Sequence, residues 1–163
     1  MKYCPSCAHK LVSKVIDGIT RAVCHQPDCG FIYWNNPVPV VAAVVEYDDK
    51  IVLARNAQWP ENVFSMITGY LERNESPESA VVREVKEELG LDSRLQAFIG
   101  HYPFPRKNQL ILAFSVESTG TIQLNHEIAE VKLLPKDKLD PNQFGELQLT
   151  AKIFQDWAGQ GYG

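Results

Sequence analysis

The sequence predicts an α+β fold with a mixed sheet, preceded by a small cysteine-bearing module. Three observations predict it. All four cysteines lie within the first 29 residues. From residue 38 onward, short apolar runs that suit strands alternate with turn residues and with a strongly punctuated helical segment at 77–89. A second apolar stripe with helical spacing lies near the end of the chain. We therefore expect the module at residues 1–34 and the main domain at 35–163.

The cysteines come in two closely spaced pairs. Cys4 and Cys7 form a C-x2-C pair, and Cys24 and Cys29 form a C-x4-C pair sixteen residues later. Between the pairs, loosely alternating apolar residues flank Asp17-Gly18, which is a hairpin turn signal. Two knuckles joined by a hairpin can present four thiolates tetrahedrally, so the pattern predicts a structural Zn²⁺ ribbon. The alternatives are reduced cysteines without metal, or a pair of disulfides, which the lack of an export signal disfavours.

The main domain begins with a nearly continuous apolar run at 38–47, which predicts a buried strand. Asp48-Asp49 then marks a turn into the next strand. Near the other end of the chain, apolar residues recur at helical spacing and predict an amphipathic C-terminal helix: Leu147, Ala151, Phe154 and Trp157. In total, strands are expected at 38–47, 51–54, 64–68, 95–99 and 110–116.

The segment 77–89 carries the punctuation of a helix. Ser76 can cap its N-terminus, and Pro77 suits the first helical position because no helix N–H is needed there. Gly90 follows the last helical residue, where a left-handed residue is favoured. At about 3.6 residues per turn, one side of the helix is apolar and is expected to face a core: Val81, Val82, Val85 and Leu89.

A neighbouring side of the same helix is acidic. Glu84, Glu87 and Glu88 stand at i, i+3 and i+4, so their carboxylates are neighbours. Like charges at this spacing repel each other, and the helix dipole gives them no relief because they lie in its negative C-terminal half. A bound cation would remove this penalty, and a set of oxygen ligands suits Mg²⁺ or Mn²⁺. The alternative is an ordinary solvated acidic face.

These acids belong to a longer pattern of Gly, five residues, Glu, seven residues, and then Arg-Glu-aliphatic-x-Glu-Glu-x-Gly-aliphatic. Every position of the pattern is filled, and the chain thereby resembles the Nudix hydrolases. The resemblance implies that the main domain is an α/β/α sandwich with a mixed sheet. The matching residues are Gly69, Glu75, Arg83, Glu84, Val85, Glu87, Glu88, Gly90 and Leu91.

The resemblance also implies a role for each polar residue of the pattern. The three glutamates of the acidic side match the family's ligands for catalytic Mg²⁺ or Mn²⁺, and the Gly69 carbonyl matches a further contact to metal. Arg83 and Glu75 match the positions that orient and support these acids. The implied reaction is attack of water on a phosphorus of a nucleoside diphosphate-linked compound, with the metal neutralising the charge that builds on the phosphoryl oxygens.

Two acids late in the chain are candidates for an additional role. Glu127 and Glu130 stand in a Glu-Ile-x-Glu spacing, where the resemblance implies an additional metal ligand or the general base. Glu127 is the first choice and Glu130 is the second. The alternative is that both are exposed loop carboxylates, which is the ordinary place for such residues.

The ribbon and a Pro-Phe-Pro segment together are similar to those of the Nudix subgroup that cleaves NADH. That subgroup carries a four-cysteine ribbon ahead of the domain and typically has Ser-Gln-Pro-Trp-Pro-Phe-Pro-x-Ser after the helix. Here Pro103-Phe104-Pro105 keeps the central part, whereas Ile99-Gly100-His101-Tyr102 replaces the first part and the final serine is absent. The resemblance implies a dinucleotide substrate such as NADH, FAD or ADP-ribose.

Composition limits the partners. The chain of 163 residues has a net charge of −4, which argues against nucleic-acid or membrane binding driven by overall charge. No apolar run approaches the ~20 residues of a membrane span, and the N-terminus shows no signal-peptide core. We therefore expect a cytoplasmic enzyme with a small-molecule substrate, no membrane partner and no nucleic-acid partner. A homodimer is expected from the family resemblance.

Two other functions stay open as alternatives. A nucleic-acid-binding or ligand-sensing regulator would use the ribbon for contact and would be expected to lack the metal-binding acids, which are intact here. An RNA-cap pyrophosphatase would apply the same chemistry to a larger substrate. It would need a positive channel, for which Arg106 and Lys107 are the candidates.

Overall fold

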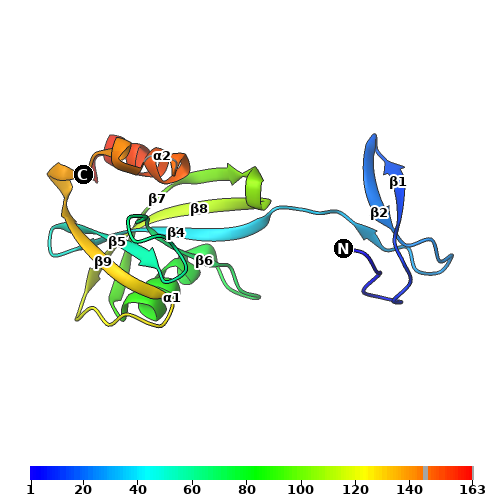
Figure 1. Ribbon diagram of the computed structural model, residues 1–163, viewed down its shortest axis with the longest axis horizontal. Helices are drawn as coiled ribbons and strands as arrows, with labels where there is room; N and C mark the ends of the chain where they lie inside the picture. The colour runs from blue at the N-terminus through cyan, green and yellow to red at the C-terminus, as the bar shows by residue number, and fades with distance from the viewer. Residues whose placement is uncertain (145–146, 163) are drawn as a thin grey trace. The chain divides into compact units, whose positions relative to one another are not determined.

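A computed structural model describes residues 1–144 and 147–162, which form two compact units, Met1–Asn36 and Pro37–Gly163. The first unit carries the cysteines and an antiparallel sheet in the order β1-β2-β3 (Figure 1). Asp17 and Gly18 have φ of 50° and 78°, as a two-residue hairpin turn requires, so the expected hairpin is confirmed. The strands are β1 Val12–Ile16, β2 Ile19–Val23 and β3 Ile32–Tyr33.

The second unit is built on a six-stranded mixed sheet. Its main path is β7-β8-β4-β5-β9, and β6 pairs with the first half of β4. β4 and β8 run parallel, whereas every other pair is antiparallel. The strands are β4 Val38–Tyr47, β5 Lys50–Asn56, β6 Ile67–Tyr70, β7 Asp92–Phe104, β8 Gln109–Thr119 and β9 Ile128–Pro135.

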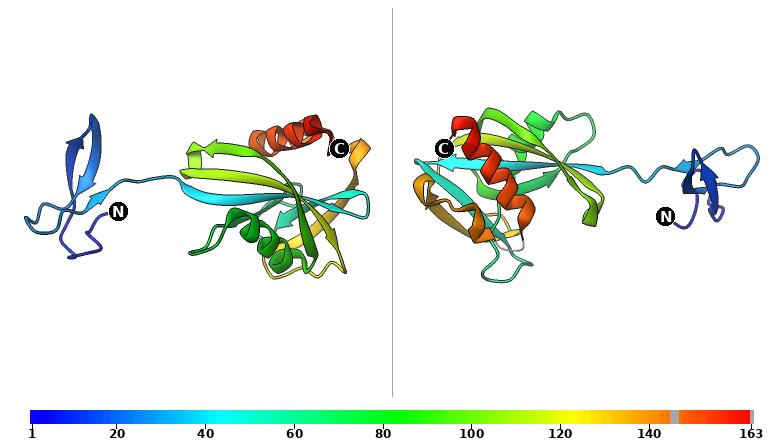
Figure 2. Two further views of the ribbon diagram at one scale, coloured as in Figure 1. Left: turned by 180° about the vertical axis from the view of Figure 1, so that it is seen from behind. Right: turned by 90° about the horizontal axis from the view of Figure 1, so that it is seen from above.

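Helices cover both faces of this sheet. α1 (Pro77–Leu89) lies on one face and α2 (Gln148–Trp157) lies on the other, as Figure 2 shows. Successive side chains of β4 point to opposite faces. Odd-numbered residues from 41 to 45 join the core beside α1, and even-numbered residues from 40 to 44 join the core beside α2. The predicted α+β class, with an α/β/α sandwich and a mixed sheet, is confirmed.

None of the helices within the described ranges combines the length and the apolar character that crossing a membrane requires.

β6 begins three residues later than the strand expected at 64–68. The larger differences between expectation and structure lie at the two edges of the sheet. β7 is longer than the strand expected at 95–99, and it extends through Pro103 and Phe104 of the Pro-Phe-Pro segment. An edge strand tolerates proline because one side of its backbone needs no ladder partner. β9 forms the opposite edge and was not expected at all. Its sequence gives a weak strand signal because charged residues interrupt it and most of its side chains are exposed or half-buried.

Candidate active site

Local sequence fixes helix α1 at both ends. The Ser76 hydroxyl accepts a hydrogen bond from the Ser79 amide at 3.2 Å and caps the N-terminus. At the other end Gly90 has φ of 72°, and its amide donates to the Lys86 carbonyl at 2.9 Å. The predicted helix, with both caps, is therefore confirmed. Its apolar side is buried against the sheet through Ala80, Val81, Val85 and Leu89.

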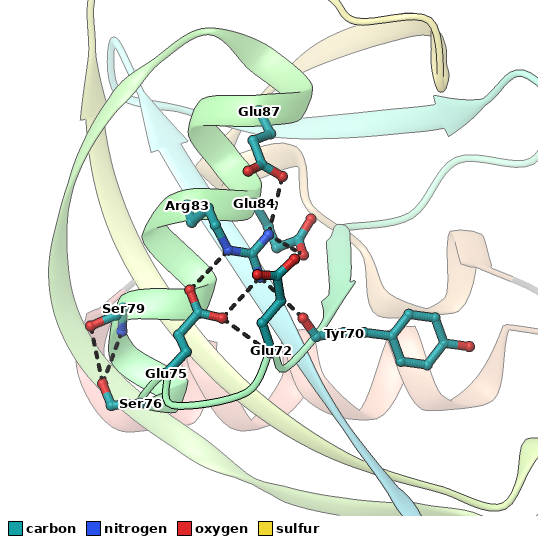
Figure 3. A network of polar contacts seen from close by, with 8 residues as sticks. All are labelled: Tyr70, Glu72, Glu75, Ser76, Ser79, Arg83, Glu84 and Glu87. Carbon is teal, nitrogen blue, oxygen red and sulfur yellow. Dashed lines mark hydrogen bonds and ion pairs between the residues drawn. The ribbon is translucent and has the colours of Figure 1, made fainter.

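Arg83 connects the acidic side of α1 to the loop that precedes the helix (Figure 3). Its Nε and Nη2 donate to the two carboxylate oxygens of Glu75 at 2.8 and 3.0 Å, which makes a bidentate ion pair and lowers the pKa of Glu75. Its Nη1 donates to Glu84 at 2.8 Å and to Glu87 at 3.1 Å. Nη2 also donates to the Tyr70 carbonyl at 3.1 Å. A single guanidinium thus positions three carboxylates and the end of β6.

Gly69 allows the sheet to approach these acids closely. A Cβ atom at this position would overlap the Glu84 carboxyl group. β6 cannot move away to make room without breaking its ladder with β4, in which Gly69 stands opposite Val41. A side chain at this position would therefore displace the Glu84 carboxyl, which lies against the Gly69 backbone.

The acids of α1 differ in burial. Glu88 is 7% exposed, and desolvation together with the nearby charges of Glu84 and Glu127 raises its pKa to about 8. Burial also raises the pKa of Glu84, although the Arg83 guanidinium opposes this shift. The Glu87 side chain is 55% exposed. Because neighbouring buried carboxylates resist ionisation together, binding of a cation would stabilise their charged forms.

Glu127 joins these acids from the segment that leads into β9. The Asn125 side chain accepts hydrogen bonds from the amides of Glu127 and Ile128, at 2.9 and 3.3 Å, and so closes a tight turn. The Asn125 amide in turn donates to the Glu88 carbonyl at 3.3 Å, at the end of α1. Asn125 is thus a positioning residue that sequence reasoning missed. An Asn two positions before a candidate acid is the signal that would have found it.

An open cavity of about 1040 Å³ lies against these acids. Glu130 does not line it. That residue lies in β9 opposite Arg55, and the two side chains form an ion pair at 3.3 Å. Gly69, Glu72 and Arg83 line the cavity together with four further carboxylates that we call the acid cluster: Glu84, Glu87, Glu88 and Glu127.

The remaining wall of the cavity comes from segments far apart in the sequence. Two aromatic residues that precede the helix differ in place. Trp59 lines the cavity, whereas Phe64 is only 8% exposed and belongs to the core. The start of α2, the predicted amphipathic C-terminal helix, also contributes to the wall. Residues lining this part include Val40, Ala42, Trp59, Tyr70, Phe104, Arg106, Lys107, Gln109, Ile111, Leu147, Leu149 and Ile153.

The cysteines form a second cluster, which belongs to the first unit. Their four Sγ atoms all lie within 4.8 Å of one another. Sγ of Cys4 is 3.5 Å from that of Cys29, and Sγ of Cys7 is 3.4 Å from that of Cys24. These separations are far longer than the roughly 2.05 Å of a disulfide. They approach the edge of about 3.8 Å that a tetrahedron of thiolates has around a metal at about 2.3 Å.

Comparison with known proteins establishes the family. The profile of the NUDIX domain matches residues 36–156. The chain therefore belongs to the Nudix hydrolase family, and the resemblance found in the sequence is confirmed. The geometry agrees with this membership, because five residues of the pattern line one cavity: Gly69, Arg83, Glu84, Glu87 and Glu88.

Curated proteins that match the chain include NAD-capped RNA hydrolases. It is 28% identical over 142 residues to the NAD-capped RNA hydrolase NudC of Pseudomonas aeruginosa (strain LESB58), a match that covers 86% of this chain and 50% of that protein. The match to NudC of Mycobacterium bovis (strain BCG / Pasteur 1173P2) is 35% identical over 103 residues and covers 61% of this chain and 33% of that protein. The chain thus spans about half the length, or less, of these curated relatives.

Solved structures share the fold. A NUDIX hydrolase from Nitrosomonas europaea matches with a TM-score of 0.84 and 21% identity, over 98% of this chain and 92% of that chain. A UDP-X diphosphatase matches with a TM-score of 0.60 and 22% identity, over 83% of this chain and 68% of that chain. At these identities the likeness establishes the architecture and no more.

Proposed function

We propose that this protein is a divalent-metal-dependent pyrophosphatase that hydrolyses the diphosphate bond of a dinucleotide such as NADH, FAD or ADP-ribose. The observation that carries the proposal is the acid cluster, in which four carboxylates from two distant segments line one cavity. Two of them, Glu84 and Glu88, have pKa values raised by burial. Such a cluster is costly to hold charged without a cation, and a catalytic role explains why it opens onto a cavity.

The donor set fits Mg²⁺ or Mn²⁺. It consists of carboxylate oxygens, with the Gly69 carbonyl at the same wall, and hard oxygen ligands are what these ions prefer. Glu84, Glu87 and Glu88 would hold the ion, and Glu127 lines the same cavity. When bound, the metal supplies neutralisation of the charge that develops on the phosphoryl oxygens and lowers the pKa of water.

The residues around the cluster have separate tasks in this proposal. Arg83 keeps the carboxylates of Glu75, Glu84 and Glu87 in one arrangement before substrate arrives, which avoids reorganisation during the reaction. Glu127 accepts the proton of the attacking water, since it lines the cavity and, among the residues that the structure describes, its ion-pair contact is only the 3.9 Å one with His126. Glu130, the other candidate, is occupied by Arg55 outside the cavity. Its place favours a structural role.

The cavity suits a dinucleotide. Its volume of about 1040 Å³ is at the upper end of the range of roughly 300–1,000 Å³ that is usual for ligand sites. Its floor contains Val40, Ala42 and Ile111, an apolar surface against which a base or a ring can pack, while the acid cluster lies at the same wall as Gly69. The curated relatives named above act on NAD-capped RNA, which contains a dinucleotide diphosphate.

The cysteine cluster is proposed to bind Zn²⁺ with Cys4, Cys7, Cys24 and Cys29 as its four ligands. The sulfur separations and the thiol donors suit a tetrahedral site. Four protein ligands leave no open position, so the zinc has a structural role. It replaces the hydrophobic core that a unit of 36 residues is too small to build. The expected homodimer and the expected cytoplasmic location stay predictions.

Hydrolysis of a substrate panel tests the proposed function. The full chain is incubated with Mg²⁺ or Mn²⁺ and NADH, FAD, ADP-ribose, diadenosine polyphosphates and nucleoside triphosphates, and the products are identified by mass. We expect one dinucleotide to be cleaved at least tenfold faster than the triphosphates, and NADH to yield NMNH and AMP. Absence of metal-dependent cleavage across the panel, from protein that binds the metal, would contradict the proposal.

The NAD-capped 5′ end of RNA is the second candidate substrate, and the names of the curated relatives favour it. The chemistry at the acid cluster would be unchanged, because the same diphosphate is cleaved. A kcat/KM at least tenfold higher for a short NAD-capped RNA than for NADH would select this candidate. Equal values would leave the free dinucleotide as the substrate.

A further inference from the structure

Arg106 and Lys107 are cationic residues on the cavity wall. They belong to η1 (Pro105–Lys107), a single 3-10 turn that joins β7 to β8, and both line the cavity. Among residues 1–144 and 147–162, neither side chain has a hydrogen-bond or ion-pair partner. Arg83 and Arg55, by contrast, are held by carboxylates. The charges of Arg106 and Lys107 are therefore available to an anion in the cavity.

The strand register places this turn away from the acid cluster. Gly69 in β6 stands opposite Val41, whereas Gln109 in β8 stands opposite Val38, and β6 and β8 flank β4 on opposite sides. Three residues along the strand and two strand spacings across it separate Gly69 from Gln109 by about 14 Å. The backbone of the turn is therefore well separated from a diphosphate held against Gly69. A second anionic group farther along the ligand suits Arg106 and Lys107 better than that diphosphate does.

The turn is held rigidly. The Asn108 amide donates to the Pro105 carbonyl at 3.1 Å, and the Asn108 carbonyl accepts from the Val38 amide at 2.9 Å, which ties the turn to β4. Gln109 donates from Nε2 to the Tyr70 hydroxyl at 3.1 Å and so connects β8 to the end of β6. Side chains that emerge from a fixed turn present their charges at a defined place, as recognition of a specific group requires.

We propose that Arg106 and Lys107 recognise a phosphate additional to the hydrolysed diphosphate, carried on the ribose of the nucleotide half that lies in the cavity. This inference rests on the proposed function and names its substrate class more closely. A guanidinium beside an ammonium group suits a phosphate, because charge-assisted hydrogen bonds to it are strong. The group has two sources, a 2′-phosphate as in NADPH or the phosphodiester of a 3′-linked nucleotide as in NAD-capped RNA.

The test compares substrates that differ only in this phosphate. One pair is NADPH and NADH, and the other is NAD with a 3′-linked adenylate and plain NAD. For each pair the ratio of kcat/KM values is measured at low salt with the full chain. We expect a ratio of at least ten in one pair. The pair that shows the ratio identifies whether the source is the 2′-phosphate or the 3′-linked nucleotide.

Variants of Arg106 and Lys107 test whether these two residues cause the ratio of kcat/KM values. Arg106→Gln with Lys107→Gln should reduce the ratio at least tenfold, whereas Arg106→Lys with Lys107→Arg should keep most of it because both charges remain. Lys50→Gln is the matched control, since Lys50 is exposed at the start of β5 and does not line the cavity. Its ratio should equal that of the wild type. Thermal melts confirm that each variant is folded.

Three outcomes contradict the inference. A ratio near one in both pairs, from an enzyme that cleaves NADH, overturns the recognition of an additional phosphate but leaves the proposed function standing. A high ratio that survives the double glutamine variant removes these two residues from the explanation. Failure to cleave any dinucleotide overturns the inference together with the function on which it rests.

Discussion

The acid cluster and the cysteine cluster each gather four potential metal ligands, but they differ in access. The carboxylates line a cavity of about 1040 Å³, and no cysteine is among the residues of its wall. The cysteine Sγ atoms lie within 4.8 Å of one another, and Cys4 is only 3% exposed. One cluster is therefore open on one side, and the other is complete in itself.

This difference separates catalysis from structure. An open site leaves room for water and phosphate beside a metal, whereas a closed site of four protein ligands offers no exchangeable position. The open cluster also needs outside support, because its carboxylates repel each other and Arg83 must hold three neighbouring acids in place. Removing a ligand should therefore destroy activity in one cluster and local structure in the other.

The largest expected effect is the loss of activity in Glu84→Gln. Glu84 lies between the Arg83 guanidinium and the Gly69 backbone, so its carboxylate occupies the centre of the site. We expect turnover to fall roughly 1,000-fold or more, as befits loss of a group that stabilises transition-state charge through the metal. Thermal stability without metal should stay the same or rise, because burial raises the pKa of Glu84 and opposes its charge.

Glu78→Gln is the matched control for that substitution. Glu78 lies in the first turn of the same helix, is exposed and does not line the cavity. Its activity should stay within about twofold of the wild type, as is usual for a surface change. Steady-state kinetics at saturating Mg²⁺ measures both variants. Wild-type turnover in Glu84→Gln would remove the acid cluster from the mechanism.

The second largest effect on kcat distinguishes Glu127 from Glu130. Glu127→Gln should lower kcat by about 100-fold because it removes the proposed proton acceptor, which is within the usual range for general-base catalysis. Glu130→Gln should lower kcat less than about threefold, since it only breaks the ion pair with Arg55. The Glu130 side chain is 47% exposed, and such ion pairs contribute little. Kinetics at saturating Mg²⁺ compares the two directly. The reverse order of effects would make Glu130 the functional acid.

A smaller effect on activity is expected from Cys4→Ser. Cys4 is buried at the centre of the first unit, and loss of one thiolate should weaken zinc binding by about 100-fold or more. Activity of the second unit should change less than about threefold because the acid cluster is built from residues of that unit alone. Elemental analysis gives the zinc content. Ser6→Ala, an exposed change within the same knuckle, should keep its zinc.

The sequence predicts those parts of each cluster in which the interacting residues lie close together along the chain. Helix α1 was predicted with both of its caps because Ser76, Pro77 and Gly90 each act on the adjacent backbone. The cysteine hairpin followed from Asp17-Gly18 for the same reason. In both cases the spacing of the residues determines the geometry, so no long-range information is needed.

The rest of the cavity could not be predicted, because it forms between distant segments. The opposite wall comes from η1 and from the start of α2, and no spacing in the sequence relates Arg106 to Leu147. β9 was missed since edge strands carry charged residues that weaken their alternation. Whether Glu127 or Glu130 faces the acids depended on the Asn125 turn, which shifts one toward α1 and leaves the other paired with Arg55.

The smallest expected effect is a pH dependence of stability that belongs to the open cluster. Glu88 has a pKa of about 8 in the folded protein, above the roughly 4.3 of a free glutamate. Between these values the folded state binds more protons than the unfolded state, so the free energy of unfolding falls as pH rises. The slope for one such group is at most about 1.4 kcal/mol per pH unit. Urea denaturation in EDTA from pH 5 to 8 measures it.

Glu88→Gln removes this dependence in the same experiment, because glutamine does not titrate. Its stability in EDTA should therefore fall less between pH 5 and 8 than that of the wild type. Adding Mg²⁺ to the wild type should have the same flattening effect, since a cation favours the ionised carboxylate that burial disfavours. Identical slopes in the wild type and in Glu88→Gln would show that burial of this carboxylate does not lower the free energy of unfolding of the metal-free protein. The acid cluster would then need no cation to offset its charge.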